Sequence, residues 1–426
     1  AGPLLVMTGM TPVTLSLGGS GTPFMFLACT ALFMLFAVGY VSMSKHIQDA
    51  GAFYSFISSG FNRPSGAGSA FVILLAYNLV VAGTTAGAAF FAHNALLSVS
   101  GIDIHWLVFA VLFWLLIGVL GANKITASAK VLGVFLTLEV LILLAFAIPT
   151  IAQGGATGLS LEPFNPMNVD IGVFAALGYV LGAFFGCEAT VVYSEEAKDP
   201  QRTIPRATYG TILFLGLFYA FVSWAIVEAF GPANVMAAAQ ADPVNLVFDA
   251  AYQFAGPVVV NLMLVLLSTG AFASALGFHN EATRYFFSLG RAGVLPEWMA
   301  RVRPKNGAPW VAVVAQSAFS AVVLIVLIAL GADAFTGIFI PLTAAGSVGI
   351  IAMQALTSLA VVSYFRKNKD LRPSLWAGLI APTAAGLLFA VGLVLMIGYF
   401  GLLSGAEWSS WVNYALLGPY LVVFVA

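Results

Sequence analysis

Apolar residues fill this chain in continuous stretches of about 20, separated by short polar segments. A helix that crosses a hydrocarbon layer of about 30 Å needs about 20 such residues. A transmembrane β-barrel would show segments of about ten residues with alternating polarity, which runs such as LVFAVLFWLLIGVLGA lack. The pattern predicts an all-α polytopic membrane protein with 12 transmembrane helices. The predicted spans are residues 3–19, 24–44, 67–92, 105–121, 125–150, 169–194, 207–230, 256–285, 310–330, 335–364, 375–401 and 410–426.

The basic residues assign each loop to one side of the membrane. All 16 Lys and Arg residues fall in, or next to, the loops that follow even-numbered spans. Loops rich in Lys and Arg stay in the cytoplasm. We therefore expect a multi-pass protein of the cell (plasma) membrane with its basic loops cytoplasmic. The basic residues are Lys45, Arg63, Lys124, Lys130, Lys198, Arg202, Arg206, Arg284, Arg291, Arg301, Arg303, Lys305, Arg366, Lys367, Lys369 and Arg372.

Composition agrees with a membrane protein and excludes other classes. The 426 residues are 61% hydrophobic and 8% charged, whereas a soluble domain carries about 25% charged residues. No linker divides the chain, so we expect a single transmembrane domain over 1–426, in contact with membrane lipid. The segment 231–255 has apolar residues at helical spacing and should lie along the surface. The sequence starts without a Met and stops in an apolar run, so we expect both ends to be trimmed.

Weak internal symmetry relates the first five spans to the next five. The first span contains Thr8-Gly9-Met10-Thr11-Pro12, and the sixth contains the glycine-rich stretch 181–186. Gly and Pro weaken helices, and paired interruptions at matching depth point to the binding site of an inverted-repeat transporter. The predicted repeats are about 1–152 and 168–366, with accessory helices at about 374–426. The alternative is that these residues only help helices to pack.

An interrupted helix at membrane depth offers free N–H and C=O groups, which are tolerated only beside protein or a water-filled cavity. Such groups suit a zwitterion, because N–H groups receive a carboxylate and carbonyls receive an ammonium. The Thr8 and Thr11 hydroxyls either contact the ligand or bond to their own helix. The predicted substrate-binding residues are Gly9, Met10, Thr11, Pro12, Gly182, Ala183, Phe184, Phe185 and Gly186.

Three carboxyl groups fall inside predicted spans, where ionisable groups are rare. Glu139 has no basic partner nearby in the sequence, so its protonation is a candidate for coupling to conformation. A protonated Glu139 that only hydrogen-bonds a neighbouring helix is the alternative. Glu188 follows the sixth-span interruption and either orients the site or anchors one helix to another. Glu281 precedes Arg284 by one helical turn, which favours a structural ion pair.

Signatures of other functions are lacking in the sequence. HExxH, P-loop, GxGxxG and CxxC motifs do not occur, and the four histidines are scattered. A basic patch of the kind that binds nucleic acid is likewise missing. We therefore expect no enzyme, no metal, no cofactor and no nucleic-acid partner.

The end of the sixth span carries a recognisable motif. The sequence there is GCEATVVYSEEAKDPQRTIPRATYG, which resembles the cytoplasmic signature of the amino acid–polyamine–organocation (APC) superfamily permeases. Segments 46–66 and 280–310 support this resemblance, which covers nearly the whole chain. The matching residues of the motif are Glu195, Glu196, Lys198, Pro200, Arg202, Ile204, Pro205, Arg206 and Ala207.

The resemblance implies a leucine-transporter-like fold, with a 5+5 inverted repeat plus two helices. It also implies alternating access and an amino acid bound between the first, third, sixth, eighth and tenth spans. This chain has Met10-Thr11-Pro12-Val13 in place of a Gly-rich run, Cys187 in place of an aromatic residue, and Gly182 in place of a bulky one. Glu139 lies where some proton-coupled members carry a Lys at a sodium position.

The predicted function is secondary active transport of an amino acid or related amine. Met10, Phe184 and Phe185 favour a neutral substrate, and proton symport is favoured over sodium coupling. Exchange of amino acids or amines is an alternative within the same family. A nontransporting amino-acid sensor on this scaffold is a second class. A membrane-embedded enzyme is a third class, and it would need His, Asp or Glu side chains converging at one depth.

Overall fold

The computed structural model describes residues 2–47, 51–122, 125–192, 199–304 and 307–425. Glu195, Glu196 and Lys198 of the motif lie outside these residues. The long helices are α3 (Thr22–Ser44), α5 (Arg63–Ser100), α6 (Trp106–Gly121), α7 (Ile125–Ala152), α10 (Pro200–Phe230), α13 (Pro257–Arg291), α14 (Trp310–Ala329), α15 (Ile340–Lys367), α16 (Ala381–Gly398) and α18 (Trp411–Val425). The shorter helices are α1 (Pro3–Leu5), α2 (Thr11–Gly18), α4 (Phe53–Gly60), α8 (Val173–Gly182), α9 (Ala189–Val192), α11 (Val235–Ala241), α12 (Leu246–Ala255) and α17 (Phe400–Ser404).

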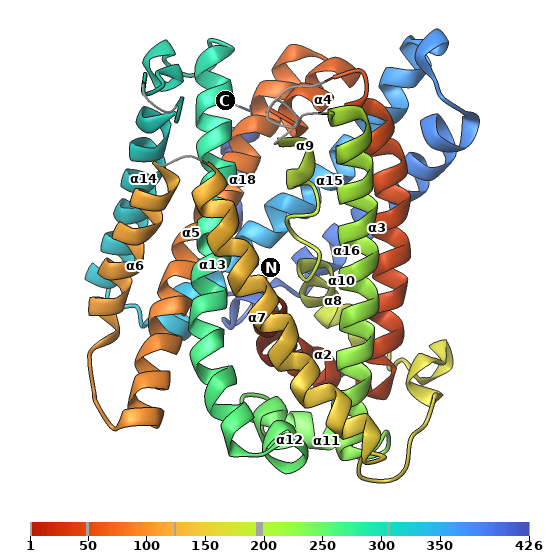
Figure 1. The fold of residues 1–426 in the computed structure, drawn as a ribbon. Helices are drawn as coiled ribbons and strands as arrows, with labels where there is room; N and C mark the ends of the chain where they lie inside the picture. Colours follow the sequence, from red (N-terminus) through yellow and green to blue (C-terminus); the bar gives the residue numbers. More distant parts are fainter. Residues whose placement is uncertain (1, 48–50, 123–124, 193–198, 305–306, 426) are drawn as a thin grey trace.

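The described residues form helices and loops without a strand, and the long helices cross the molecule side by side (Figure 1). Eight of their helical stretches are long and apolar enough to cross a membrane, and three shorter apolar helices accompany them. The protein is therefore an all-α polytopic membrane protein, as predicted. The bounds of the long helices follow those of the predicted spans. The count of twelve membrane crossings stays a prediction.

Helix ends that carry basic residues gather at one end of the bundle. Arg63 begins α5, Arg202 lies in the first turn of α10, Arg291 ends α13 and Lys367 ends α15. In Figure 1 these helix ends lie beside α4 at the top, whereas α11 and α12 lie across the bottom. We call the α4 end the inner end and the α11–α12 end the outer end. The helices α11 and α12 confirm the predicted surface helix within 231–255.

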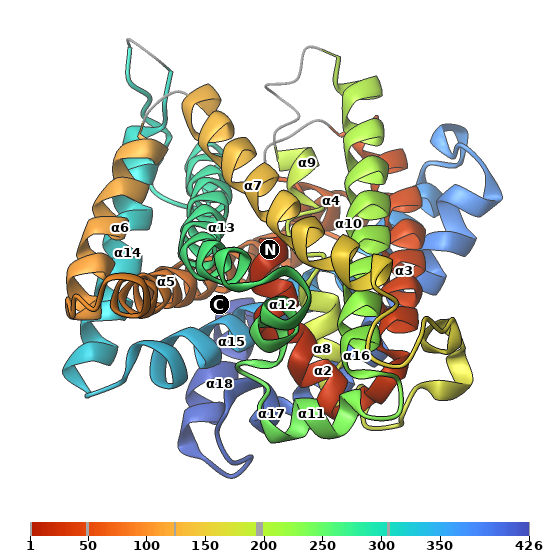
Figure 2. The same ribbon diagram turned by 60° about the horizontal axis from the view of Figure 1, so that its bottom comes forward.

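The described part of the first span has its Gly2 end in the middle of the bundle. The marker of the N-terminus is central both in Figure 1 and in Figure 2, which brings the outer end forward. From there α1, the π-helical turn η1 (Val6–Met10) and α2 run to the outer end. A 3₁₀ turn, η2 (Gly19–Gly21), then reverses the chain into α3. Gly19 has φ of 63°, a left-handed conformation that glycine adopts without strain.

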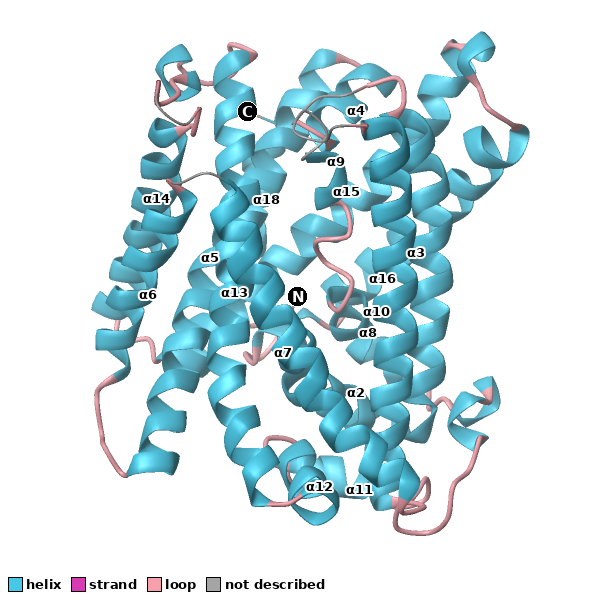
Figure 3. Ribbon diagram, in the orientation of Figure 1, coloured by secondary structure: helices cyan, strands magenta, loops and turns pink. Residues whose placement is uncertain are grey.

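The sixth span is interrupted at the predicted place. The helix α8 ends at Gly182 and α9 begins at Ala189. In Figure 3, α9 lies above α8 and close to α4. Figure 3 shows the connecting residues as a loop that descends between the long helices. A loop at this depth must satisfy its backbone groups within the protein, because lipid offers no hydrogen-bond partner. It is therefore the most demanding segment of the fold.

Small residues set how closely the helices approach. A Cβ added to Gly216 of α10 would overlap the Thr30 hydroxyl of α3 and would lie 2.7 Å from Thr30 Cβ. The hydroxyl already donates to the Phe26 carbonyl at 2.6 Å. Rotating Thr30 therefore does not clear enough space, since its Cβ is also too close. Gly210, on the same helix, faces open space.

We expect Gly216→Ala to destabilise the protein by about 1–3 kcal/mol, because the added methyl group overpacks the α3–α10 contact. Gly210→Ala is the matched control, and it should be neutral or slightly stabilising since alanine favours a helix. The measurement is the thermal unfolding midpoint of each purified variant in one detergent. Equal midpoints for the two variants would contradict this account of the contact.

Candidate functional site

Three cavities follow one another along the bundle. The outer cavity, of about 280 Å³, lies toward the outer end, and the inner cavity, of about 350 Å³, lies toward the inner end. A central cavity of about 30 Å³ shares lining residues with both. Leu5, Met10 and Phe339 line the outer and central cavities, while Phe185 and Phe278 line the central and inner cavities. The row of cavities is thus narrowest at its centre.

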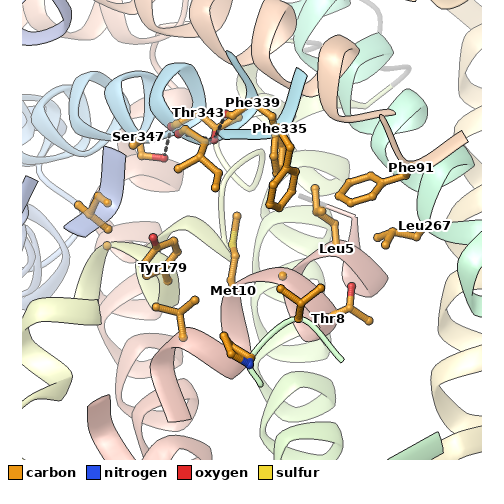
Figure 4. A pocket seen from close by; sticks show the side chains of 18 of the residues that line it. Leu5, Thr8, Met10, Phe91, Tyr179, Leu267, Phe335, Phe339, Thr343 and Ser347 are labelled. Carbon is orange, nitrogen blue, oxygen red and sulfur yellow. Dashed lines mark hydrogen bonds between the residues drawn. The ribbon is translucent and has the colours of Figure 1, made fainter. Parts of the chain in front are cut away.

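The outer cavity has mainly apolar walls. Figure 4 shows Met10, Phe91 and Phe335 around the space, with Thr8 and Tyr179 among the polar side chains. No charged side chain is among the described residues that line it. Thr8 donates its hydroxyl proton to the Leu4 carbonyl at 2.8 Å, so this polar group is already satisfied. Such a space favours apolar groups over charged ones.

Five predicted spans meet at the central cavity. Leu5 and Met10 come from the first span, while Thr84 comes from α5 in the third. The other walls come from the sixth, eighth and tenth spans. The tenth span here comprises the π-helical turn η7 (Ala334–Phe339) and α15. These wall residues are Gly182, Phe185, Ser274, Phe278, Phe339, Thr343 and Ser347.

The loop of the sixth span forms part of two cavity walls. Its backbone makes turn-type hydrogen bonds, such as Phe185 N–H to the Gly182 carbonyl at 3.2 Å. Gly186 has φ of 97°, which side-chain-bearing residues rarely adopt, and a Cβ added there would meet open space. Gly182 faces the central cavity, and Gly186 and Cys187 face the inner one. The loop thus places main chain next to the cavities.

The predicted interruption of the first span at 8–12 is wrong. The helix continues there as η1 and α2, and Thr11 N–H donates to the Val6 carbonyl in a π-helical bond. The Thr11 hydroxyl also bonds its own helix, at 3.0 Å from the Val6 carbonyl. A π-helical turn widens the helix just before Pro12, where the ring would otherwise clash with the preceding turn.

The N-cap of α1 is Gly2, whose extended backbone precedes Pro3. Leu4 N–H donates to a Glu139 carboxylate oxygen at 2.9 Å, and Gly2 N–H donates to the Ser274 hydroxyl at 3.0 Å. Gly270 leaves the room for this carboxyl, because a Cβ there would lie 2.7 Å from its Cδ. Glu139 therefore occupies the N-terminus of a helix, where the helix dipole favours an anion.

Glu188 ties the sixth-span loop to the surrounding helices. Its carboxyl accepts hydrogen bonds from the Tyr77 hydroxyl at 3.2 Å, Gly186 N–H at 3.1 Å and the Gln354 amide at 3.4 Å. Tyr40 of α3 donates to its backbone carbonyl at 2.9 Å. The side chain is 1% exposed and lines none of the three cavities. Glu188 thus positions the loop and joins it to α3, α5 and α15.

Comparison with known proteins adds the family to this geometry. Residues 3–425 match the family model described as amino acid permease. The chain belongs to the amino acid permease family. As a member of the APC superfamily it is a multi-pass membrane protein that transports amino acids.

Individual relatives of this permease share about a quarter of its residues. It is 24% identical to the branched-chain amino acid permease BcaP of Bacillus subtilis (strain 168), over 95% of this chain and 86% of that one. The BcaP of Lactococcus lactis subsp. cremoris (strain MG1363) is 25% identical over 71% of this chain and 69% of its own. A methylthioribose transporter of Bacillus subtilis (strain 168) is 24% identical over 73% of this chain and 62% of its own.

The structure separates the predicted site residues into two groups. Gly9, Met10, Gly182, Phe185 and Gly186 line the cavities. The other four residues are buried and lie outside the described cavity walls. They are Thr11, Pro12, Ala183 and Phe184.

Phe184 shows how a neighbour of a cavity residue can face away from the cavity. Its ring stacks on Phe33 of α3 at 4.8 Å between centroids and meets Tyr219 of α10 edge-on. In a chain of turns, consecutive side chains point in different directions, so adjacency to a cavity residue does not place a side chain in the cavity. Sequence reasoning also missed Ser274 and Phe278, which lie in the small-residue run 270–277 or one residue after it.

We expect Gly186→Ala to weaken amino-acid binding by about tenfold. Alanine at φ of 97° is strained by about 1–2 kcal/mol, so the loop should shift at the cavity wall. Gly154→Ala is the matched control, since Gly154 has φ of 83°, also faces open space and lies in the loop after α7. Ligand-dependent thermal shifts measure the binding. Equal binding by both variants would show that the loop conformation does not matter.

Proposed function

We propose that this permease is a secondary active transporter of a neutral amino acid that works by alternating access. The narrow central cavity between two larger ones is the observation that carries the proposal. This small central space separates the two larger cavities, and movements of the five surrounding spans would enlarge it for the substrate and open one side at a time. The predicted inverted repeats, about 1–152 and 168–366, supply the moving halves, and the accessory helices lie at about 374–426.

Apolar walls support a neutral side chain on the substrate. Met10, Phe91 and Phe339 line the outer cavity, whose described walls include no charged group. Burying a charged side chain against them would cost several kcal/mol without a partner. The relatives named for branched-chain amino acids fit the same chemistry, so we propose leucine, isoleucine and valine as the first substrates to test.

The substrate backbone binds between the start of the first helix and the sixth-span loop. Leu4 N–H already donates to Glu139, so this helix N-terminus holds one carboxylate. A substrate carboxylate competes for the same N–H group while Glu139 is ionised. Protonation of Glu139 removes that competition, and proton and substrate then bind together. We propose that this competition between the Glu139 carboxylate and the substrate carboxylate couples transport to protons. Coupling to sodium is disfavoured.

The proposed location is the cell membrane, with the inner end toward the cytoplasm. The support is the gathering of Arg63, Arg202, Arg291 and Lys367 at one end of the bundle. Basic ends of this kind stay on the cytoplasmic side. An acidic exterior would then drive substrate from the outer cavity to the inner one.

Uptake of labelled leucine into proteoliposomes tests the function. With one proton per substrate, a pH difference of one unit, acidic outside, supports about tenfold accumulation. Lysine should not compete, whereas isoleucine and valine should. Leucine counterflow without net uptake into leucine-free proteoliposomes under a pH gradient would indicate exchange instead of symport. Saturable leucine binding without uptake or counterflow would overturn transport and favour a sensor.

We expect Glu139→Gln to abolish the response to the pH gradient while leucine counterflow continues. The amide cannot gain or lose a proton, and it holds the Leu4 N–H less strongly than a carboxylate does. Glu228→Gln is the control, because Glu228 is buried at the outer end, where it accepts from Trp224 Nε1 at 3.0 Å. Gradient-driven accumulation by Glu139→Gln equal to that of the unmodified protein would remove Glu139 from the coupling.

A further inference from the structure

A tyrosine lies between two buried carboxyl groups beside the inner cavity. The Tyr77 hydroxyl donates to Glu188 Oε1 at 3.2 Å and also interacts with the carboxyl of Glu281 on α13. Glu188 is 1% exposed and Glu281 6% exposed. Glu281 Oε2 has no hydrogen-bond partner among the described residues. The arrangement therefore brings two acids together at a place that excludes bulk water.

Hydrogen-bond counting limits the protons on this pair. A tyrosine hydroxyl has one proton, so it donates to one carboxyl oxygen at a time. If it donates to Glu188, the Glu281 carboxyl bonds the hydroxyl oxygen only when Glu281 carries a proton. If both carboxyl groups were ionised, one of them would face the Tyr77 hydroxyl oxygen without a proton between the two acceptors. One shared proton satisfies all three groups.

Repulsion between like charges leads to the same number. Among the described residues, the titratable and charged groups that face the two acids are Tyr40 of α3, Cys187 of the loop, and Arg284 and Tyr285 of α13. Two ionised carboxylates in a low-dielectric interior repel each other strongly. One proton on the pair removes this repulsion.

The two acids differ in their access to the inner cavity. Glu281 lines this cavity together with Glu139. Glu188 does not line it, and its carboxyl accepts a hydrogen bond from Gly186 N–H. A proton from cavity water therefore reaches Glu281 first. Glu188, which fixes the sixth-span loop, senses that proton through Tyr77.

We propose that Glu281 and Glu188 share one proton across Tyr77, and that Glu281 is the member that exchanges it with the inner cavity. This rests on the proposed proton coupling and adds a second step to it. A hydronium ion in the cavity gives a proton to Glu281 and becomes water. Glu281 then donates a proton to the Tyr77 oxygen as Tyr77 donates its own to Glu188, so Tyr77 stays neutral. Reversal of these transfers returns the proton to the cavity.

The first experiment compares net leucine uptake with leucine counterflow as the pH on the inner side is varied. We expect Glu281→Gln to reduce the effect of inner pH on net uptake at least fivefold, while counterflow stays within twofold. Glu281→Asp keeps a carboxyl group and should retain the pH effect. Glu228→Gln, the distant buried control, should behave like the unmodified protein.

Infrared spectroscopy of the purified full chain tests the shared proton without transport. The unmodified protein should show a protonated carboxyl band that Glu281→Gln lacks and that Tyr77→Phe shifts. Tyr77→Phe removes the bridging hydroxyl with little change in volume, so it remains informative if Glu281→Gln folds poorly.

The outcomes separate this inference from the proposed function. The inference is overturned if the inner-pH profile of net uptake is the same in Glu281→Gln and the unmodified protein, or if their carboxyl bands agree. Uptake by the unmodified protein that ignores pH would overturn proton symport instead. The infrared comparison would then still decide whether the two acids hold a proton.

Discussion

The need to satisfy main-chain hydrogen bonds away from water governs the centre of this molecule. A gap in a transmembrane helix is tolerated only where protein groups replace the missing helical partners. Residues 183–188 meet this condition by turn bonds and by Glu188, whose carboxyl receives Gly186 N–H. Tyr77 and Gln354 also donate to that carboxyl, so α5 and α15 are joined to the loop. Without these contacts, residues 183–188 would not be held in place in the cavity walls.

Acidic and apolar groups are divided between the two ends of the cavity row. Glu139 and Glu281 line the inner cavity, while the outer cavity has no charged lining among the described residues. Glu139 receives an N–H group from the first helix, and Glu281 faces Tyr77. In the proposed mechanism, the outer cavity receives the neutral side chain of the substrate, and the acids at the inner cavity bind the proton. Substrate selection and energy coupling would then rest on different residues.

Particular residues show how far the sequence could predict the site. The sixth-span gap was predictable because Gly182 and Gly186 lie close together within the span, and Gly186 does adopt a left-handed backbone. The same reasoning failed at Gly9 and Pro12, where a π-helical turn absorbs the proline without unwinding. Glu281 was expected to form a structural ion pair with Arg284, but the sequence did not predict that it is buried beside a cavity. Local composition shows where a helix is destabilised. It does not show whether the chain responds with a loop or with a π-helical turn.

The sequence by itself determined the class of protein, the course of its spans and the side that carries its basic residues. These follow from hydrophobic length and charge, which add up along the chain without reference to distant contacts. Only the tertiary structure decided which side chains face the cavities and that Glu139 meets Leu4, 135 residues away in the chain. Spans that are apolar all round do not reveal which face turns inward. Helix rotation and crossing, set by packing between distant segments, made that choice.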